Sequence, residues 1–222
     1  MVPLKAGIEV SVAATKSYTA QLAALYWVGL YLAEQKNSLP AEQLAALKQD
    51  LCELSAKMEE ILSNAAAVKS VADKLKNFSD MVYIGRGINL ASALEGALKL
   101  KEISYINANG YAAGELKHGP IALLDENMPV MAVLGPGITL PKMISNCEEA
   151  KARNALLAAV VSEKADIAPG LFDYRLNIPD TNETTFPLLA NIPLQLLAYY
   201  IADSLGREVD QPRNLAKSVT VE

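Results

Sequence analysis

Residues 81–105 read MVYIGRGINLASALEGALKLKEISY, and this stretch decides the fold. It begins with a short apolar run at Met81–Ile84, continues through the glycine turn at 85–87, and then shows helical spacing from Leu90 to Tyr105. A strand, a glycine turn and a helix in this order open a βα unit. We therefore expect an α/β fold that extends outward from this unit.

The chain after this unit contains three more apolar runs of strand length. They predict buried strands at 129–134, 156–161 and 174–178, with helices at 141–153 and 185–205. We expect Pro187 and Pro193 to mark an irregular start of the last helix. Strands that alternate with helices imply a mostly parallel sheet covered on both faces, which makes three layers.

The chain before the unit predicts helices and one strand. Helical spacing covers three ranges: 18–35, 41–64 and 66–77. Apolar residues alternate at Ile8, Val10 and Val12, which predicts a strand. Thr15 or Ser17 can cap the helix at 18–35. That helix is apolar almost all round, so it predicts an interface or an exposed apolar patch.

Composition limits the classes of partner. The chain has 222 residues, 51% hydrophobic and 20% charged, which is enough apolar content for a packed core. A net charge of −5 argues against nucleic acid and anionic membranes. Two distant cysteines and one histidine favour free thiols over a disulfide framework or a zinc site. We find neither a signal peptide nor an uninterrupted apolar span, so we expect a cytoplasmic protein. We also expect that it needs no metal or cofactor.

The predicted helix at 90–105 carries a narrow charged strip. Glu95, Lys99 and Glu102 are spaced i, i+4 and i+7, so they fall within about a 60° arc of a mostly apolar surface. Such a strip indicates either proton-transfer chemistry or a solvated Glu–Lys pair. The spacing alone favours the solvated pair.

Other candidate site residues lie outside this helix. Gly85 and Arg86 follow a predicted strand, where ligands of open α/β sheets bind, although any βα turn favours glycine. His118 is the only histidine, and imidazole changes charge near neutral pH. Lys217 lies in the polar tail; it can meet a carbonyl or a phosphate if the tail folds back, and otherwise it only aids solubility.

Three segments resemble one enzyme family. They are ALEGALKLKEISYINANGYAAGELKHGP at 93–120, PLQLLAYYIAD at 193–203 and VDQPRNLAKSVTVE at 209–222. They are similar to the glucosamine-6-phosphate synthases, also called glutamine–fructose-6-phosphate aminotransferases. The resemblance implies part of the isomerase half, which consists of two flavodoxin-like sugar isomerase (SIS) domains. It implies the end of a first SIS domain and a connecting helix at 1–42, a second SIS domain at 43–206, and a C-terminal active-site tail at 207–222.

The resemblance also implies residue roles. Glu102 matches the carboxylate that moves a proton between C1 and C2 of the sugar, and Lys99 matches a lysine near it. Lys217 matches the lysine that forms a Schiff base with the open-chain ketose. His118 matches the ring-opening histidine, which reaches a neighbouring subunit's site in the family. The candidate substrate-binding residues are Val12, Ala14, Ala216, Gly85, Arg86 and Arg213. The family often carries serine where this chain has Ala14.

The implied activity converts fructose 6-phosphate and glutamine-derived ammonia to glucosamine 6-phosphate, a step of amino-sugar synthesis toward UDP-N-acetylglucosamine. The implied partners are the sugar phosphate, a glutaminase domain in the full enzyme and a second copy in a homodimer. One alternative is a SIS module that binds sugar phosphate without catalysis. Another is a fragment that is inactive alone, because the family's Ser/Thr-rich phosphate loop belongs to the first SIS domain.

Overall fold

The computed structural model describes residues 1–217, so the predicted tail is described as far as Lys217, and residues 218–222 lie outside. The elements in chain order are α1 (Lys16–Gln35), α2 (Ala41–Ser63), α3 (Ala65–Leu75), β1 (Asp80–Gly85), α4 (Asn89–Ser104), β2 (Asn107–Ala112), the 3₁₀ helices η1 (Ala113–His118) and η2 (Pro120–Leu123), β3 (Val130–Leu134), α5 (Leu140–Lys151), β4 (Leu157–Ser162), β5 (Tyr174–Ile178) and α6 (Phe186–Ser204). The predicted βα unit is therefore β1 followed by α4.

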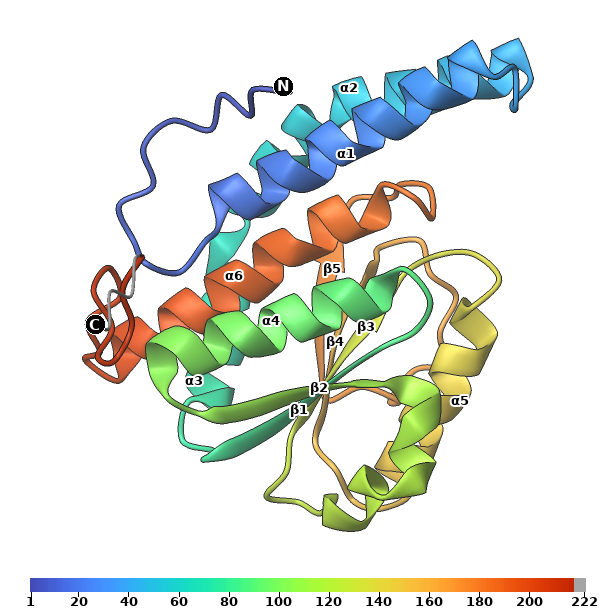
Figure 1. Cartoon of the computed structure of the whole chain (residues 1–222). Helices are drawn as coiled ribbons and strands as arrows, with labels where there is room; N and C mark the ends of the chain where they lie inside the picture. The colour runs from blue at the N-terminus through green and yellow to red at the C-terminus, as the bar shows by residue number, and fades with distance from the viewer. Residues whose placement is uncertain (218–222) are drawn as a thin grey trace.

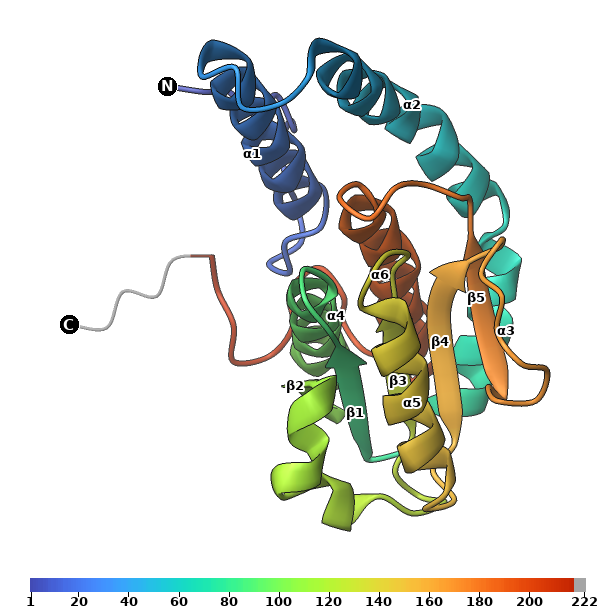
Figure 2. The same ribbon diagram turned by 90° about the vertical axis from the view of Figure 1, so that its right-hand side faces the viewer.

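The five strands form one parallel sheet in the order β2-β1-β3-β4-β5. This is the flavodoxin-like strand order, so the predicted α/β fold is confirmed. Helices α3, α4 and α6 cover one face of the sheet, and α5 covers the other (Figures 1 and 2).

The apolar run of β1 is explained by burial on both faces. Met81 and Tyr83 pack into the core beneath α3, α4 and α6. Val82 and Ile84 pack into the second core, beneath α5 and η1. Successive side chains of a strand point to opposite faces, so a strand buried on both sides must be apolar at every position.

The sequence patterns missed one strand. β2 pairs in parallel with β1 from Asn107 to Ala112, but its sequence, NANGYA, contains little apolar surface. As an edge strand it is only partly buried, so it lacks the apolar run that identifies central strands. Gly110 lies under α4, where an added Cβ would be 2.8 Å from a methyl carbon of Leu94.

The predicted strand at residues 8–12 is wrong, and this part of the chain is irregular. The side chains of Ile8 and Val10 are 86% and 74% exposed, and no strand of the described residues pairs with them. Alternation alone does not form a strand where there is no sheet edge to receive it. The expected strand–helix remnant is therefore a coil followed by α1.

The predicted cap of α1 is also corrected. Thr15 precedes the helix but makes no side-chain capping bond. Instead, the carboxylate of Glu9 accepts hydrogen bonds from the backbone N–H groups of Thr15 (2.8 Å) and Ser17 (3.3 Å) and from the Ser17 hydroxyl. A carboxylate here satisfies unpaired N–H groups and favours the positive end of the helix dipole.

The helices differ from expectation in one further respect. α6 runs unbroken through Pro193, so the predicted irregular start at 187–193 is wrong.

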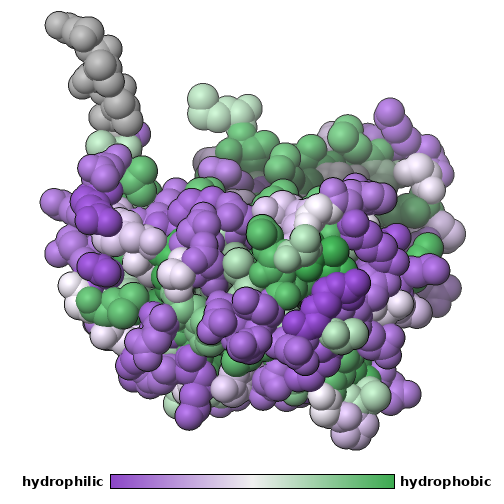
Figure 3. All heavy atoms as spheres, turned by 90° about the horizontal axis from the view of Figure 1, so that it is seen from below, coloured by the Kyte–Doolittle hydropathy of each residue, from purple (hydrophilic) through white to green (hydrophobic). Residues whose placement is uncertain are grey.

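α1 and α2 project beside the sandwich (Figure 2), and α1 exposes Leu25, Trp27 and Tyr31, which confirms the predicted apolar patch. The face turned away from these two helices is mostly hydrophilic, with small hydrophobic patches (Figure 3). No helix among residues 1–217 is both long and apolar enough to cross a membrane.

Candidate functional site

The charged strip of α4 is buried. Lys99 is only 3% exposed, and its Nζ lies 3.4 Å from Glu95 Oε1 and 2.6 Å from Glu102 Oε2. The solvated pair favoured by the spacing is therefore wrong. One buried ammonium group lies between two carboxylates, because a helix brings residues three and four positions apart onto the same face.

The two carboxylates of the strip differ in environment. Burial raises the pKa of Glu95; Lys99 opposes this rise, and the charge of Glu102 adds to it. The side chain of Glu102 is 21% exposed, against 12% for Glu95. Glu102 is therefore the more accessible carboxylate, and the buried pair beside it holds it in place.

Lys99 is expected to contribute to the stability of the fold. Replacing it by methionine, which has a similar length, leaves two largely buried carboxylates without their cation. We expect the free energy of unfolding to fall by about 3 kcal/mol. Thermal unfolding followed by circular dichroism should show a melting temperature lower by about 6–12 °C.

The matched control is Lys101→Met, since Lys101 is exposed on the same helix. The control should unfold within about 2 °C of the parent. A Lys99→Met protein as stable as the control would contradict the buried ion-pair assignment.

The C-terminal tail and the segment before α1 meet at the C-terminal end of α4 (Figure 1). The backbone N–H of Arg213 donates to the hydroxyl of Tyr105 at 2.8 Å, and Tyr105 directly follows α4. The N–H of Val12 donates to the Asp210 carbonyl at 3.0 Å. We call this region, formed by 9–15, the end of α4 and 207–217, the tail site.

Several predicted residues belong to the tail site. The ammonium group of Lys217 donates to the Glu9 carbonyl oxygen, so this lysine lies against the segment that carries Val12 and Ala14. Ala216 precedes it and is exposed. The guanidinium carbon of Arg213 lies 4.2 Å from the centre of the Tyr105 ring. The strip of Glu95, Lys99 and Glu102 ends three residues before Tyr105.

Glu9 is a site residue that the sequence reasoning missed. Burial raises its pKa, but hydrogen bonds from Ser17 and Thr15 outweigh this, and the pKa falls to about 2. Its carboxylate anchors the start of α1 while its carbonyl oxygen holds Lys217. Nothing in the local sequence signals this role, because both contacts depend on the folded path of the chain.

Gly85 and Arg86 lie away from the tail site. They precede α4, whereas Glu102 lies 13 positions after its first residue, a separation of about 20 Å along the axis. Gly85 has a structural explanation, because a Cβ there would be 2.4 Å from the Asn89 carbonyl oxygen. Arg86 instead lines a small polar pocket with Lys117, Lys142, Asn146 and Glu149.

His118 also lies away from the tail site. It ends η1, which follows the carboxyl end of β2, and its side chain is exposed. Tyr105 lies just before the amino end of the same strand, and the six residues of β2 span about 17–20 Å. His118 therefore lies toward the carboxyl ends of the parallel strands, and Glu102 lies toward their amino ends.

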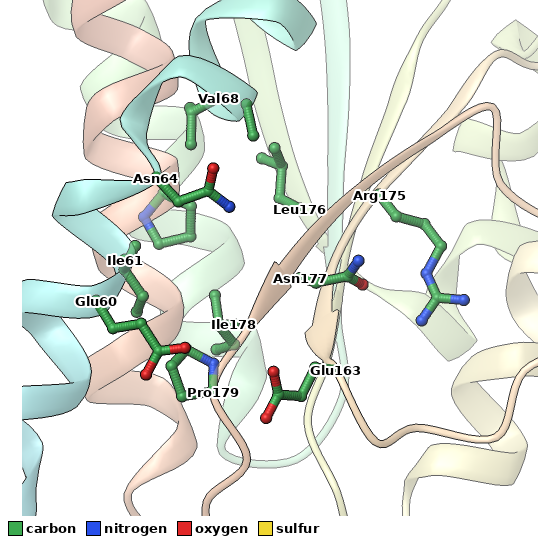
Figure 4. A pocket seen from close by; sticks show the side chains of 12 residues that line it. Glu60, Ile61, Asn64, Val68, Glu163, Arg175, Leu176, Asn177, Ile178 and Pro179 are labelled. Atoms are coloured by element: carbon green, nitrogen blue, oxygen red, sulfur yellow. The ribbon is translucent and has the colours of Figure 1, made fainter.

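A further pocket lies where the end of α2 and the start of α3 meet β5. Glu60, Asn64, Glu163 and Arg175 are among its lining residues (Figure 4). None of the predicted site residues lines it. Among residues 1–217, no group of three or more His, Cys, Asp or Glu side chains could hold a metal ion.

The tail site has the groups that acid–base and amine chemistry require. It places a partly exposed carboxylate, Glu102, on a helix whose end holds the segment that carries Lys217. A carboxylate can remove a proton from carbon, and a lysine amine can form an imine with a carbonyl.

Comparison with known proteins gives a family match. The family model of the SIS domain matches residues 74–202. A glutamine–fructose-6-phosphate aminotransferase (isomerizing) from Synechocystis is 51% identical over 218 residues, which are 98% of this chain and 34% of that protein. One from Thermosynechococcus vestitus is 50% identical over 223 residues, 100% of this chain and 36% of that protein. The chain thus spans about a third of the length of the curated relatives it matches.

A solved structure gives a similar match. The C-terminal domain of a glucosamine-fructose-6-phosphate aminotransferase from Francisella tularensis superposes with a TM-score of 0.87 at 39% identity. The superposition covers 94% of this chain and 59% of the Francisella chain. A structure described as that of a putative tagatose-6-phosphate ketose/aldose isomerase, from Clostridium novyi, has a TM-score of 0.79 at 17% identity, which shows a shared fold alone.

Proposed function

Because this chain belongs to the SIS domain family, we propose that it is the isomerase part of an enzyme that makes glucosamine 6-phosphate from fructose 6-phosphate and glutamine-derived ammonia. The observation that carries the proposal is the tail site, where the segment bearing Lys217 is held at the end of α4 that bears Glu102. The relatives' names supply the substrates, and the two side chains supply the chemistry.

The proposed reaction begins at C2 of the open-chain ketose. The Lys217 amine adds to the C2 carbonyl, and water leaves as the imine forms. Ammonia then displaces the lysine at C2. Glu102 takes a proton from C1 and returns one to C2, while the C1 hydroxyl loses its proton and the imine nitrogen gains one, so that C1 becomes the aldehyde and C2 carries the amine.

Lys99 and Glu95 support the base in this proposal. The Lys99 ammonium lies 2.6 Å from Glu102 Oε2 and 3.4 Å from Glu95 Oε1, so the ion pair fixes where the Glu102 carboxylate points. Val12, Ala14 and Ala216 lie on the two segments of the tail site, where the sugar would bind.

His118 is proposed to open the sugar ring in the site of a second copy, since it lies at the carboxyl ends of the strands and Glu102 lies toward their amino ends. A homodimer, a glutaminase domain and a cytoplasmic location belong to the same proposal. The exposed apolar side chains of α1 support a contact with another protein surface.

The experiment is an assay of the intact protein, with any upstream part it has, beside the 222-residue chain. With fructose 6-phosphate and ammonia, the intact protein should form glucosamine 6-phosphate. The 222-residue chain should bind the sugar phosphate weakly or not at all by calorimetry. Binding by the intact protein without any product would contradict the enzyme assignment.

One observation favours a binding module without catalysis as the second candidate. Arg86, Lys117 and Lys142 surround a pocket near the carboxyl end of β1, where open α/β sheets bind ligands. Three cations with one carboxylate, Glu149, suit an anion such as phosphate. Under this reading the intact protein binds sugar phosphate, Arg86→Gln weakens that binding, and no product forms.

A further inference from the structure

Tyr105 has an unusual backbone conformation. It occupies the C-cap position of α4 with φ 66°, in the left-handed region. Glycine and asparagine are the usual residues there, because a side chain in this region is crowded by the backbone. Asn37, Asn154 and Asn214 also have positive φ, which asparagine tolerates well, and Lys5 has a positive φ in the irregular segment before α1. A tyrosine at this position therefore needs a compensating role.

The tyrosine side chain is engaged by the C-terminal tail. Its hydroxyl oxygen accepts a hydrogen bond from the backbone N–H of Arg213 at 2.8 Å. The guanidinium carbon of Arg213 lies 4.2 Å from the ring centre, and that of Arg207 lies 5.5 Å from it. Both lie within cation–π range, so one aromatic ring holds two arginines and one backbone group of the tail.

These contacts hold Lys217 near the end of α4. Lys217 follows Arg213 by four residues, a span of at most about 14 Å when extended. Asp210 is tied to Val12 by a backbone hydrogen bond of 3.0 Å, and the Ser11 hydroxyl donates to the Val209 carbonyl at 3.0 Å. The tail is therefore fixed to 9–15 by these bonds and to α4 by Tyr105.

We propose that Tyr105 is a positioning residue that clamps the C-terminal tail to the end of α4 and thereby places Lys217 beside Glu102. The inference rests on the proposed function, because it gives Lys217 a purpose at that place. The left-handed conformation turns the chain out of α4 and directs the ring toward the tail. Lys217 forms the imine, and Tyr105 acts only through the tail.

The first test measures the clamp without any activity. In the 222-residue chain, Tyr105→Phe removes the hydroxyl but keeps the ring between the arginines. We expect the Arg213 amide to exchange with solvent about fivefold to tenfold faster, as measured by nuclear magnetic resonance. Tyr105→Asn also removes the ring, and the protection of the whole 207–217 segment should be lost.

Melting temperatures separate a clamp from a general stabiliser. Asparagine suits the left-handed position, so Tyr105→Asn should unfold within about 3 °C of the parent while the tail loses protection. Tyr31→Phe is the matched control, since Tyr31 is exposed on α1. It should change neither the melting temperature nor the tail exchange.

The second test measures, in the intact protein, whether the contacts of Tyr105 with the tail support imine formation at Lys217. Borohydride trapping of the sugar imine at Lys217 and kcat should fall about tenfold to a hundredfold in Tyr105→Asn. Tyr105→Phe keeps the ring, so its trapping and kcat should fall less than those of Tyr105→Asn. KM for fructose 6-phosphate should change less than kcat, because the sugar is not bound by Tyr105.

The outcomes decide between the inferences. Unchanged tail exchange in Tyr105→Asn overturns the clamp. Lost tail protection with trapping equal to that of the parent overturns the positioning role. A parent that traps no sugar at Lys217 contradicts the proposed function, and with it the purpose of placing Lys217. Tail exchange then still decides whether Tyr105 anchors the tail.

Discussion

Replacing Lys217 by alanine is expected to abolish glucosamine 6-phosphate formation in the intact protein, with turnover falling on the order of 10³-fold or more. The lysine amine is the group that forms the imine, and alanine offers no nucleophile in its place. Lys217 is exposed, and its described contact is with the Glu9 carbonyl oxygen. The fold should therefore remain, and the melting temperature should change by less than about 2 °C.

The matched control for this variant is Lys74→Ala. Lys74 is exposed on α3, so it shares the charge and the exposure of Lys217 but not its place in the tail site. The control should keep full turnover. Turnover in Lys217→Ala equal to that of Lys74→Ala would remove the lysine from the mechanism.

Replacing Glu102 by glutamine is expected to lower turnover by about 10²–10⁴-fold, because an amide cannot take the proton from C1. Exchange of the C1 hydrogen with solvent, followed in deuterated water, should fall by the same factor. The variant keeps the size of the side chain, and Lys99 keeps Glu95 as its partner at 3.4 Å. A large loss of stability is therefore not expected.

The two variants should separate two chemical steps. Glu102→Gln should still form the imine at Lys217, since the proton transfer comes after it, whereas Lys217→Ala should form none. Glu148→Gln is the control, as Glu148 is exposed on α5. Solvent exchange at C1 that proceeds normally in Glu102→Gln would assign the base to another group.

The sequence predicts the central strands and the helices because the burial of these elements requires local patterns of apolar residues. Strands β1, β3 and β4 are mostly apolar, since each is covered on both faces. α2 shows its apolar residues at helical spacing because one side of it packs on the core. These elements alone predict an α/β fold with a mostly parallel sheet, whereas the flavodoxin-like class came from the family resemblance.

Two local patterns are misleading because a strand depends on its neighbours. β2 is polar, yet it pairs along its length with β1. Residues 8–12 alternate, yet they lie beside the tail, where Val12 bonds to Asp210. Whether a segment becomes a strand depends on which edge it meets, and that is a property of the fold.

The candidate site is predicted only in part, for a similar reason. The spacing places Glu95, Lys99 and Glu102 on one helix face, but their burial depends on what covers that face. The contact of Glu9 with Lys217 and that of Tyr105 with Arg213 join residues about 200 and 100 positions apart in the chain. The resemblance supplied Lys217, which composition alone leaves as an ordinary polar residue of a tail.

The most direct test of the tail site is borohydride reduction of the intact protein in the presence of fructose 6-phosphate, followed by peptide mass spectrometry. Reduction converts the imine into a stable secondary amine, so the sugar phosphate remains on the lysine that formed it. The proposal predicts one labelled peptide, modified at Lys217, which disappears when Lys217 is alanine. Labelling at Lys99 or another lysine, or no labelling under turnover conditions, would contradict it.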